Sequence, residues 1–315
     1  MQYRKLGTWG LKVSSLALGG WTTFGATVRD PHTIRTILLK AYDAGITTFD
    51  IADIYAHGEA EKRMGNVLRE LPRERLVVST KVFFPMSDDP NDRGLSRKHV
   101  HESIDRSLSR LGMEYVDLYY AHRPDPETPL EESVRAFSDV VASGKALYWG
   151  TSEWPADMVQ KAVALARANG WHAPVVEQPE YSLLHRRIEH ELFPLAGELG
   201  TGLVVWSPLG QGLLTGKYDR GIPEGSRFDR LPQFTQRLWT EANRKRTLAM
   251  RELADEAGLT RAQLALAWVL AHPQISSAII GVTSLAQLDD NLVAADLNVP
   301  HEILRKLDEL FNDPD

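Results

Sequence analysis

Short apolar runs alternate with amphipathic stretches along almost the whole chain. The runs have the length and residue types of buried β-strands, whereas the stretches between them repeat apolar residues at helical spacing. We expect strands at Leu16–Gly19, Thr47–Asp50, Leu76–Lys81, Val116–His122, Ala146–Thr151, Val175–Glu177, Gly202–Ser207 and Ala278–Gly281. We expect helices near residues 32–44, 58–70, 96–111, 130–143, 156–169, 188–199, 242–257 and 284–295.

The repeated strand-then-helix order predicts parallel strands, because each return to the sheet needs a crossover connection. Eight such units in 315 residues match a closed (β/α)8 TIM barrel of the α/β class. An open doubly wound sheet is the rival fold. It is disfavoured because no Gly-x-Gly-x-x-Gly motif follows the first strand, where the chain reads Leu18-Gly19-Gly20-Trp21. We predict one domain over residues 1–315.

Three segments add to the plain repeat. Residues 3–13 read as a β-hairpin that turns at Gly7–Gly10, and we expect it to plug one end of the barrel. An extra helix is expected over residues 260–271 with Thr260 as its N-cap, so the barrel carries extra helices toward its C-terminus. Residues 208–240 are rich in Gly, Pro and Arg, and a connection of that length is usually functional.

The composition excludes several classes of function. The chain has 36 basic and 42 acidic residues and a net charge of −6, which argues against nucleic acid as its main partner. It has no cysteine, so disulfides, thiolate metal sites and cysteine nucleophiles are excluded, and its histidines form no metal-binding pattern. No apolar signal region opens the chain, and no run approaches the roughly 20 residues that span a bilayer. We expect a cytoplasmic protein without membrane insertion.

Four polar residues follow successive predicted strands. Asp50 ends the second strand and Tyr55 follows it, Lys81 ends the third and His122 ends the fourth. Strand C-termini of a barrel converge on one face, so these residues are expected to be neighbours. Each alone could be structural, as a rim tyrosine, a buried ion pair or a packed histidine. Together they favour a device for protonating an oxygen, in which Lys81 lowers the pKa of Tyr55 and Asp50 holds Lys81.

Reduction of a carbonyl suits this set of groups. Tyr55 would protonate the developing alkoxide while His122 orients the carbonyl oxygen. No side chain can donate a hydride, so a nicotinamide cofactor is required. Aromatic residues follow the first, third and fifth strands and predict a pocket for a small carbonyl substrate with an apolar body. The predicted lining is Trp21, Tyr55, Phe84, His122 and Trp154.

Ordered motifs along essentially the whole chain resemble the aldo-keto reductase superfamily. They are Phe49-Asp50-Ile51-Ala52-Asp53-Ile54-Tyr55, Ser79-Thr80-Lys81, Asp117-Leu118-Tyr119-Tyr120-Ala121-His122-Arg123-Pro124-Asp125, Gly150-Thr151-Ser152, Glu177-Gln178-Pro179-Glu180-Tyr181 and Trp206-Ser207-Pro208-Leu209. The branch looks closest to bacterial reductases related to voltage-gated potassium channel beta subunits. That likeness depends on Trp206-Ser207-Pro208-Leu209, Thr215-Gly216-Lys217-Tyr218 and Ser226-Arg227.

The resemblance implies that Asp50, Tyr55, Lys81 and His122 form a catalytic tetrad with Tyr55 as the general acid. It implies NADPH as the cofactor, with NADH as an alternative, and makes residues 208–240 a lid over it. The resemblance also implies that Ser152 and Gln178 bind the nicotinamide carboxamide and that Trp206 stacks on the nicotinamide ring. The implied cofactor-binding residues are Gly20, Trp21, Asp50, Ser152, Gln178, Trp206, Ser207, Pro208, Leu209, Gly212, Lys217, Arg227, Gly281, Thr283, Gln287, Asp290 and Asn291.

Two positions depart from the family pattern. Many members carry Asn after the Ser of Gly-Thr-Ser, where this chain has Glu153, so we do not assign this position to the carboxamide. Many reductases hold the 2′-phosphate with cations near the eighth strand, whereas residues 280–287 contain none. The 2′-phosphate then relies on Lys217 and Arg227, or NADH is accepted too. Arg220 and Arg230 are expected to be solvated.

Two functions of different class follow from the resemblance. One is an NADPH-dependent reductase of aldehydes or ketones; the other is a cofactor-bound regulatory or sensor subunit with little turnover, like the channel beta subunits. The channel subunits depart from histidine at the position of His122, so this residue favours the enzyme. A cofactor-free lyase or isomerase on the same barrel would leave Trp206, Lys217 and Arg227 unexplained. A homo-oligomer is compatible with the resemblance.

Overall fold

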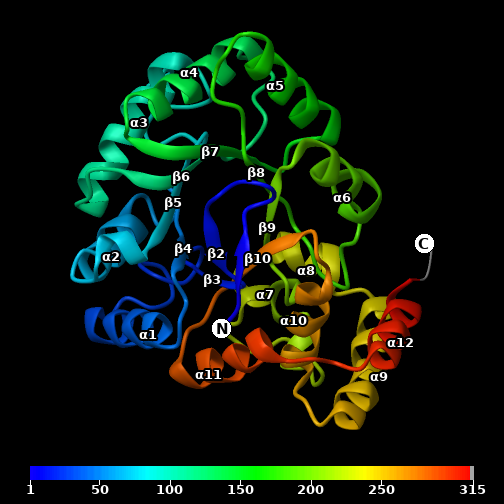
Figure 1. Ribbon diagram of the computed structural model, residues 1–315. Helices are drawn as coiled ribbons and strands as arrows, with labels where there is room; N and C mark the ends of the chain where they lie inside the picture. Colours follow the sequence, from blue (N-terminus) through cyan, green and yellow to red (C-terminus); the bar gives the residue numbers. More distant parts are fainter. Residues whose placement is uncertain (313–315) are drawn as a thin grey trace.

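Eight parallel strands close a barrel in the computed structural model, which describes residues 1–312. Neighbours around the barrel follow the order β10-β3-β4-β5-β6-β7-β8-β9, so the predicted closed barrel is confirmed (Figure 1). The barrel strands are β3 (Leu16–Gly19), β4 (Thr48–Asp50), β5 (Val77–Val82), β6 (Val116–Ala121), β7 (Ala146–Ser152), β8 (Val176–Gln178), β9 (Gly202–Trp206) and β10 (Ile275–Ile280).

Helices surround the strands and start and stop near the predicted positions (Figure 1). Local signals fix several of these ends: Asp30 caps the first helix by accepting from the Thr33 amide, and Thr260 forms the predicted N-cap in a capping box with Gln263. The predicted helices are α1 (Pro31–Asp43), α2 (Glu59–Leu68), α3 (Arg97–Leu111), α4 (Leu130–Ala142), α5 (Ala156–Ala168), α6 (Ile188–Leu199), α9 (Glu241–Ala257), α10 (Arg261–Ala271) and α11 (Leu285–Val293).

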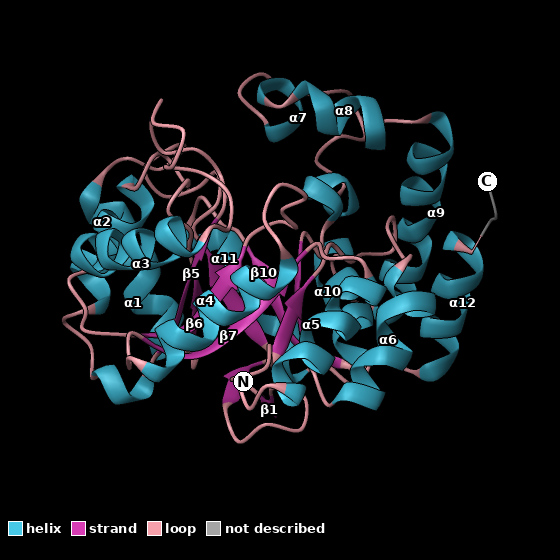
Figure 2. Ribbon diagram, turned by 90° about the horizontal axis from the view of Figure 1, so that it is seen from above, coloured by secondary structure: helices cyan, strands magenta, loops and turns pink. Residues whose placement is uncertain are grey.

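The N-terminal hairpin closes one end of the barrel, as predicted. Its strands are β1 (Tyr3–Lys5) and β2 (Lys12–Ser14), which pair antiparallel. Leu6 and Val13 of the hairpin are buried in one cluster with interior-facing strand residues. Figure 2 shows the hairpin at the end of the barrel opposite to α7 (Arg227–Arg230) and α8 (Pro232–Leu238). The far end of the barrel is therefore the end at which a site can open.

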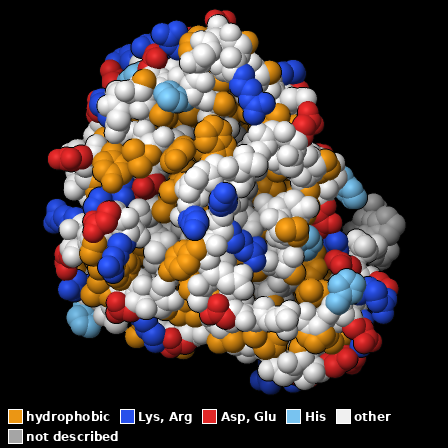
Figure 3. Space-filling model, in the orientation of Figure 1, with side chains coloured by type: hydrophobic (Ala, Val, Ile, Leu, Met, Phe, Trp, Pro, Cys, Tyr) orange, Lys and Arg blue, Asp and Glu red, His pale blue; other side chains and the backbone are white. Residues whose placement is uncertain are grey.

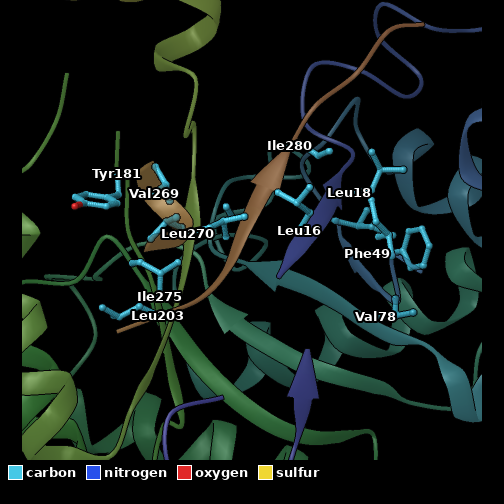
Figure 4. Close-up of a cluster of buried hydrophobic side chains, with 14 of the residues drawn as sticks. Leu16, Leu18, Phe49, Val78, Tyr181, Leu203, Val269, Leu270, Ile275 and Ile280 are labelled. Carbon is cyan, nitrogen blue, oxygen red and sulfur yellow. The ribbon is translucent and has the colours of Figure 1, made fainter. Parts of the chain in front are cut away.

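Side chains alternate between the barrel interior and the helix layer along each strand, as the period of two in a strand requires. In β3, Ala17 belongs to the interior cluster, whereas Leu16 and Leu18 belong to the core between strands and helices. Figure 4 shows this outer core, where Leu16 and Leu18 lie with residues of neighbouring strands and of α10. The alternation decides which polar residues enter the barrel.

Several elements were missed by the sequence prediction. The segment 208–240 folds into the 3-10 helix η2 (Gly210–Thr215), α7 and α8, which share a small core of Leu213, Tyr218, Phe228 and Leu238. These helices are short, so their apolar periodicity is too brief to detect. The chain also forms α12 (His301–Phe311), whose Ile303, Leu307 and Phe311 are buried, and the 3-10 turns η1 (Arg73–Arg75) and η3 (Ala294–Asp296).

On the hairpin side of the molecule, charged side chains of both signs are interspersed with apolar and uncharged ones (Figure 3). None of the helices within residues 1–312 combines the length and apolar character needed to cross a bilayer.

Candidate active site

Strand parity brings the predicted acid and cation together inside the barrel. Val77 faces the interior, so Ser79 and Lys81 on the same strand face it as well. Asp50 is paired in register with Ser79 across β4 and β5. The Lys81 ammonium lies 2.6 Å from Asp50 Oδ2, and both side chains are buried.

Lys81 uses all three of its N–H donors on protein oxygens. Besides Asp50, its Nζ donates to the Ile51 carbonyl at 2.7 Å and to the Tyr55 hydroxyl oxygen at 3.1 Å. A buried cation is stable only when it is paired and hydrogen-bonded in this way. Because Tyr55 accepts from Lys81, its own hydroxyl hydrogen is available to a group in the cavity that Tyr55 lines.

The second oxygen of Asp50 is held by neutral donors. Ser79 Oγ donates to Asp50 Oδ1 at 2.8 Å, and Gln178 Nε2 donates to the same atom at 2.9 Å. The Ser152 hydroxyl donates to the Gln178 backbone carbonyl at 2.9 Å. Gln178 and Ser152 were expected to bind the nicotinamide carboxamide. In this structure, the Gln178 amide and the Ser152 hydroxyl instead donate to other protein oxygens.

The expectation that Lys81 lowers the pKa of Tyr55 is wrong for this structure. Burial of the phenol and the Asp50 carboxylate raise the pKa of Tyr55 well above its usual value, and the opposing effect of Arg123 is smaller. The positive charge of Lys81 is offset by the Asp50 carboxylate that holds it. Tyr55 therefore stays protonated at neutral pH, which is the state that a proton donor needs.

His122 faces Tyr55 across the mouth of the barrel. The two rings meet edge to face with centroids 5.7 Å apart, and the Phe84 ring also meets the imidazole edge to face at 5.0 Å. Burial, and then the charges of Lys81 and Arg123, lower the pKa of His122 well below its usual value. The imidazole is therefore neutral and can donate one hydrogen bond without carrying charge.

Aromatic side chains wall the cavity beside these groups. Trp21 meets Trp206 at 5.9 Å and Phe234 of α8 at 5.7 Å, both edge to face. Trp21, Phe84 and Phe234 line a cavity of about 890 Å³, which also contains Asp50, Tyr55 and His122 among its lining residues. The predicted residues Trp21, Tyr55, Phe84 and His122 are thus brought together.

The structure does not bring Trp154 to this pocket. Trp154 is buried in the core between strands and helices and is absent from the cavity lining. Its backbone amide donates to Glu177 Oε1 at 3.1 Å, which draws the residue toward the outer layer of the barrel. Position just after a strand identifies the correct end of the barrel but does not say which way the side chain turns.

The cavity continues from the tetrad to a cluster of three cations. Lys217, Arg227 and Arg230 line it, and none of them forms an ion pair with a carboxylate within residues 1–312. Burial, followed by the charges of Arg227 and Arg230, lowers the pKa of Lys217 to about 8. Unneutralised cations this close together repel one another, so the cluster is suited to a multiply charged anion. Arg230 is exposed, as expected, but it also lines the cavity.

The backbone beside the cation cluster contains several residues with positive φ. Ser207 and Gln211 have φ values of 57° and 56°, and Gly212 has a φ of 92°. The chain turns sharply at these residues, and the Gly210 and Gly212 amides donate within the turn to the Ser207 and Leu209 carbonyls at 2.9 Å each. A Cβ at Gly212 would lie 2.6 Å from Cε of Lys217, so only glycine lets the lysine pack here.

Comparison with known proteins identifies the family of this arrangement. The profile described as "Aldo/keto reductase family" matches residues 15–312. The chain belongs to the aldo/keto reductase family. Relatives in Schizosaccharomyces pombe and Arabidopsis thaliana, both named as voltage-gated potassium channel beta subunits, are 44% and 45% identical. The alignments cover 98% and 94% of this chain, and 93% and 92% of the relatives. The likeness to bacterial members stays a prediction.

The predicted adenosine end of this aldo/keto reductase also lines the cavity. Thr283 donates to Gln287 Oε1 from both its amide and its hydroxyl, and Asp290 accepts from Thr260 and from Gln263. Asn291 is buried. The residues from this group that line the cavity are Gly281, Thr283, Gln287, Asp290 and Asn291.

One predicted glycine lies outside the cavity. Gly19 lines it, whereas Gly20 does not. A Cβ on Gly20 would come within 2.8 Å of Met64 Sδ, so this glycine allows close packing against α2. The other predicted lining residues, Ser152, Gln178, Trp206, Ser207, Pro208, Leu209 and Gly212, are all present.

Glu153 holds the indole of Trp206 in place. One of its carboxylate oxygens, Oε1, accepts from Trp206 Nε1 at 2.9 Å and from the Glu180 amide at 2.6 Å. The family resemblance could not supply this role, because the usual residue here is Asn. Further cavity residues were missed by sequence reasoning, chiefly Thr22, Arg123, Gln211, Ser226 and Phe234. Arg123 and Ser226 had a signal, since each stands in a motif that resembles the family.

Proposed function

We propose that this protein is an NADPH-dependent oxidoreductase that reduces aldehydes or ketones to alcohols. The observation that carries the proposal is the hydrogen-bonded set of Asp50, Lys81 and Tyr55, open to a cavity that runs on to an unpaired cation cluster. A proton donor and an anion site in one cavity suit a carbonyl substrate and a phosphorylated cofactor. Members of this family generally bind NADP(H).

Each residue of the tetrad has a separate task in the proposed reaction. Tyr55 gives its proton to the carbonyl oxygen as that oxygen becomes an alkoxide. Lys81 donates to the Tyr55 oxygen and stabilises the phenolate that is left, while Asp50 fixes the ammonium. Neutral His122 donates a hydrogen bond that orients the carbonyl. The bound nicotinamide supplies the hydride that reaches the carbonyl carbon.

The cavity residues fit a dinucleotide. Trp206, held by Glu153, provides a flat apolar face for the nicotinamide, and the turn at residues 207–212 with Lys217 suits the phosphates. A Cβ at Gly281 would lie 3.7 Å from Nη2 of Arg227, so this arginine lies at the adenosine end of the cavity. Helix α7 helps to enclose the cavity, since its Arg227 also donates to the Thr22 hydroxyl at 2.7 Å.

Loss of the cations at the phosphate end is expected to affect NADPH more than NADH. Lys217→Ala or Arg227→Ala should raise the Kd for NADPH about 10- to 100-fold, because each removes charge-assisted hydrogen bonds to phosphate. Titration of intrinsic tryptophan fluorescence with each cofactor measures this. Equal losses for NADPH and NADH would exclude contact with the 2′-phosphate.

Binding of NADPH is expected to weaken above pH 8. The phosphates prefer charged Lys217, so cofactor raises the pKa of this lysine from its value of about 8 in the free protein. Affinity is therefore complete below pH 8 and falls as the lysine deprotonates, by about tenfold between pH 7 and pH 9. Fluorescence titrations across this range test the prediction, with Lys217→Arg as the control that keeps the charge and should flatten the profile.

A second candidate function follows from the relatives, which are named as voltage-gated potassium channel beta subunits. In that case the protein would bind cofactor as a regulatory subunit and turn it over little. The hydrogen-bonded tetrad and the neutral His122 support the enzyme instead, because a binding subunit has no need of a buried proton donor facing a substrate pocket.

The two functions are separated by one pair of measurements. Fluorescence titration with NADPH and NADH comes first, followed by the rate of NADPH oxidation against aromatic and short-chain aldehydes. Tight binding with turnover supports the reductase. Tight binding without turnover on any aldehyde favours the regulatory subunit, and the absence of binding overturns both.

A further inference from the structure

Arg123 is a cation at the catalytic end of the cavity with no carboxylate to neutralise it. It follows β6 directly after His122 and lines the cavity. Its Nη1 donates to the His122 backbone carbonyl at 2.5 Å and approaches the Ser152 hydroxyl at 3.5 Å. Its Nε and Nη2 make no hydrogen bond within residues 1–312, and no Asp or Glu in that range pairs with it.

Two other arginines that lie beside barrel strands are neutralised by carboxylates. Arg237 donates to both oxygens of Glu180 at 2.8 and 2.5 Å, and Arg73 lies 2.7 Å from Asp117. Both carboxylate oxygens of Asp50, the acid of the tetrad, already accept hydrogen bonds from Lys81, Ser79 and Gln178, and neither contacts Arg123. Arg123 therefore leaves a net positive charge at the substrate end of the cavity.

The guanidinium lies close to the groups that would hold the carbonyl. It is 5.6 Å from the centre of the Phe84 ring, and that ring contacts His122 at 5.0 Å. The charge of Arg123 acts on the tetrad. It helps to lower the pKa of His122, although burial and the charge of Lys81 have larger effects. A guanidinium with two free donors presents a planar fork that matches a carboxylate or a phosphate.

We propose that Arg123 binds an anionic group on the substrate, so that the preferred substrates are small aldehydes or ketones carrying a carboxylate or a phosphate. The inference rests on the proposed reductase function and adds the substrate class. Arg123 orients such a substrate by its charged end, while Phe84 and Trp21 cover the carbon skeleton. Neutral aldehydes still reach Tyr55 but lack the charged contact.

The test compares acids with neutral molecules of nearly the same shape. The 2-, 3- and 4-carboxybenzaldehydes are each assayed beside their methyl esters, and glycolaldehyde phosphate beside glycolaldehyde. We expect kcat/KM for the best carboxybenzaldehyde, or for the phosphate, to exceed that of its neutral partner by about 10- to 100-fold. The aromatic pairs report a carboxylate site and the glycolaldehyde pair a phosphate site, and the position of the carboxylate reports its distance from the aldehyde.

Variants of Arg123 separate substrate binding from the other roles this residue could have. Arg123→Met should lower kcat/KM for the acids about 10- to 100-fold more than for their neutral partners, which abolishes the preference, and it should leave the Kd for NADPH within about twofold. Arg123→Lys should keep part of the preference. Arg135→Met is the matched control, since Arg135 also lies over an aromatic ring, Trp171 at 5.1 Å, but outside the cavity.

Each contrary result has a distinct meaning. Reduction of neutral aldehydes with no preference for acids or phosphates in the unaltered protein overturns the inference and leaves the proposed function standing. Equal losses on acids and esters in Arg123→Met and Arg123→Lys, or weaker NADPH binding, assign Arg123 to the fold or to the cofactor carboxamide. Absence of turnover on every aldehyde overturns the proposed function and this inference together.

Discussion

Tyr55→Phe is expected to lower kcat for aldehyde reduction by about a hundred- to ten-thousandfold. The change removes only the hydroxyl that accepts from Lys81 and offers its hydrogen to the cavity. The Kd for NADPH should stay within about twofold, because the proton moves only in the transition state. Single-turnover oxidation of bound NADPH by a saturating aldehyde measures the rate, and fluorescence titration measures the binding.

A tyrosine at the opposite end of the barrel provides the control for this substitution. Tyr148 lies in β7 and packs edge to face with Trp9 of the hairpin at 6.3 Å. Tyr148→Phe should leave both rate and binding unchanged. If Tyr55→Phe reduced carbonyls at the normal rate, another group would be the acid; if it lost NADPH binding, the hydroxyl would be part of the cofactor site instead.

The barrel and the core of the site could be predicted because both follow from local pattern. Apolar runs followed by helical periodicity determine a parallel barrel, and a period of two along β5 turns Ser79 and Lys81 inward. Polar residues at the ends of consecutive strands then become neighbours whatever their separation in sequence. This is why the sequence could place Asp50, Lys81, Tyr55 and His122 beside one another.

What could not be predicted depends on packing between segments. The outward turn of Trp154, the packing of Gly20 on Met64 and the contact of Glu153 with Trp206 have no local pattern. The direction of the Tyr55 pKa shift also needs three-dimensional burial, which outweighs the nearby cation once Asp50 has paired with it.

The segment 208–240 is joined to the barrel by contacts at both of its sides. Arg237 of α8 pairs with buried Glu180 after β8, and the same glutamate donates its amide to Glu153, which holds Trp206. On the other side, Arg230 of α7 donates to Thr27 at 2.6 Å. These contacts join α7 and α8 to the barrel on either side of the cavity that Lys217, Arg227 and Arg230 line.

Lys81→Met is expected to cost both stability and activity. The substitution leaves Asp50 as a buried carboxylate with only Ser79 and Gln178 as donors, and removal of one partner from a buried pair costs about 3–5 kcal/mol. The midpoint of urea unfolding, followed by tryptophan fluorescence, should fall accordingly. Reduction should fall about as far as in Tyr55→Phe, because the phenolate left after proton transfer loses its cation.

Two double variants decide whether this loss comes from the buried charge. Asp50→Asn combined with Lys81→Met removes both charges, so its unfolding midpoint should recover most of the loss seen in Lys81→Met alone. Tyr55→Phe combined with Lys81→Met should be no slower than Tyr55→Phe, since Lys81 acts on the substrate only through that hydroxyl. Additive losses in stability would mean that the ion pair is not coupled. Additive losses in rate would mean that Lys81 reaches the substrate or the cofactor directly, and the proton path through Tyr55 would have to be redrawn.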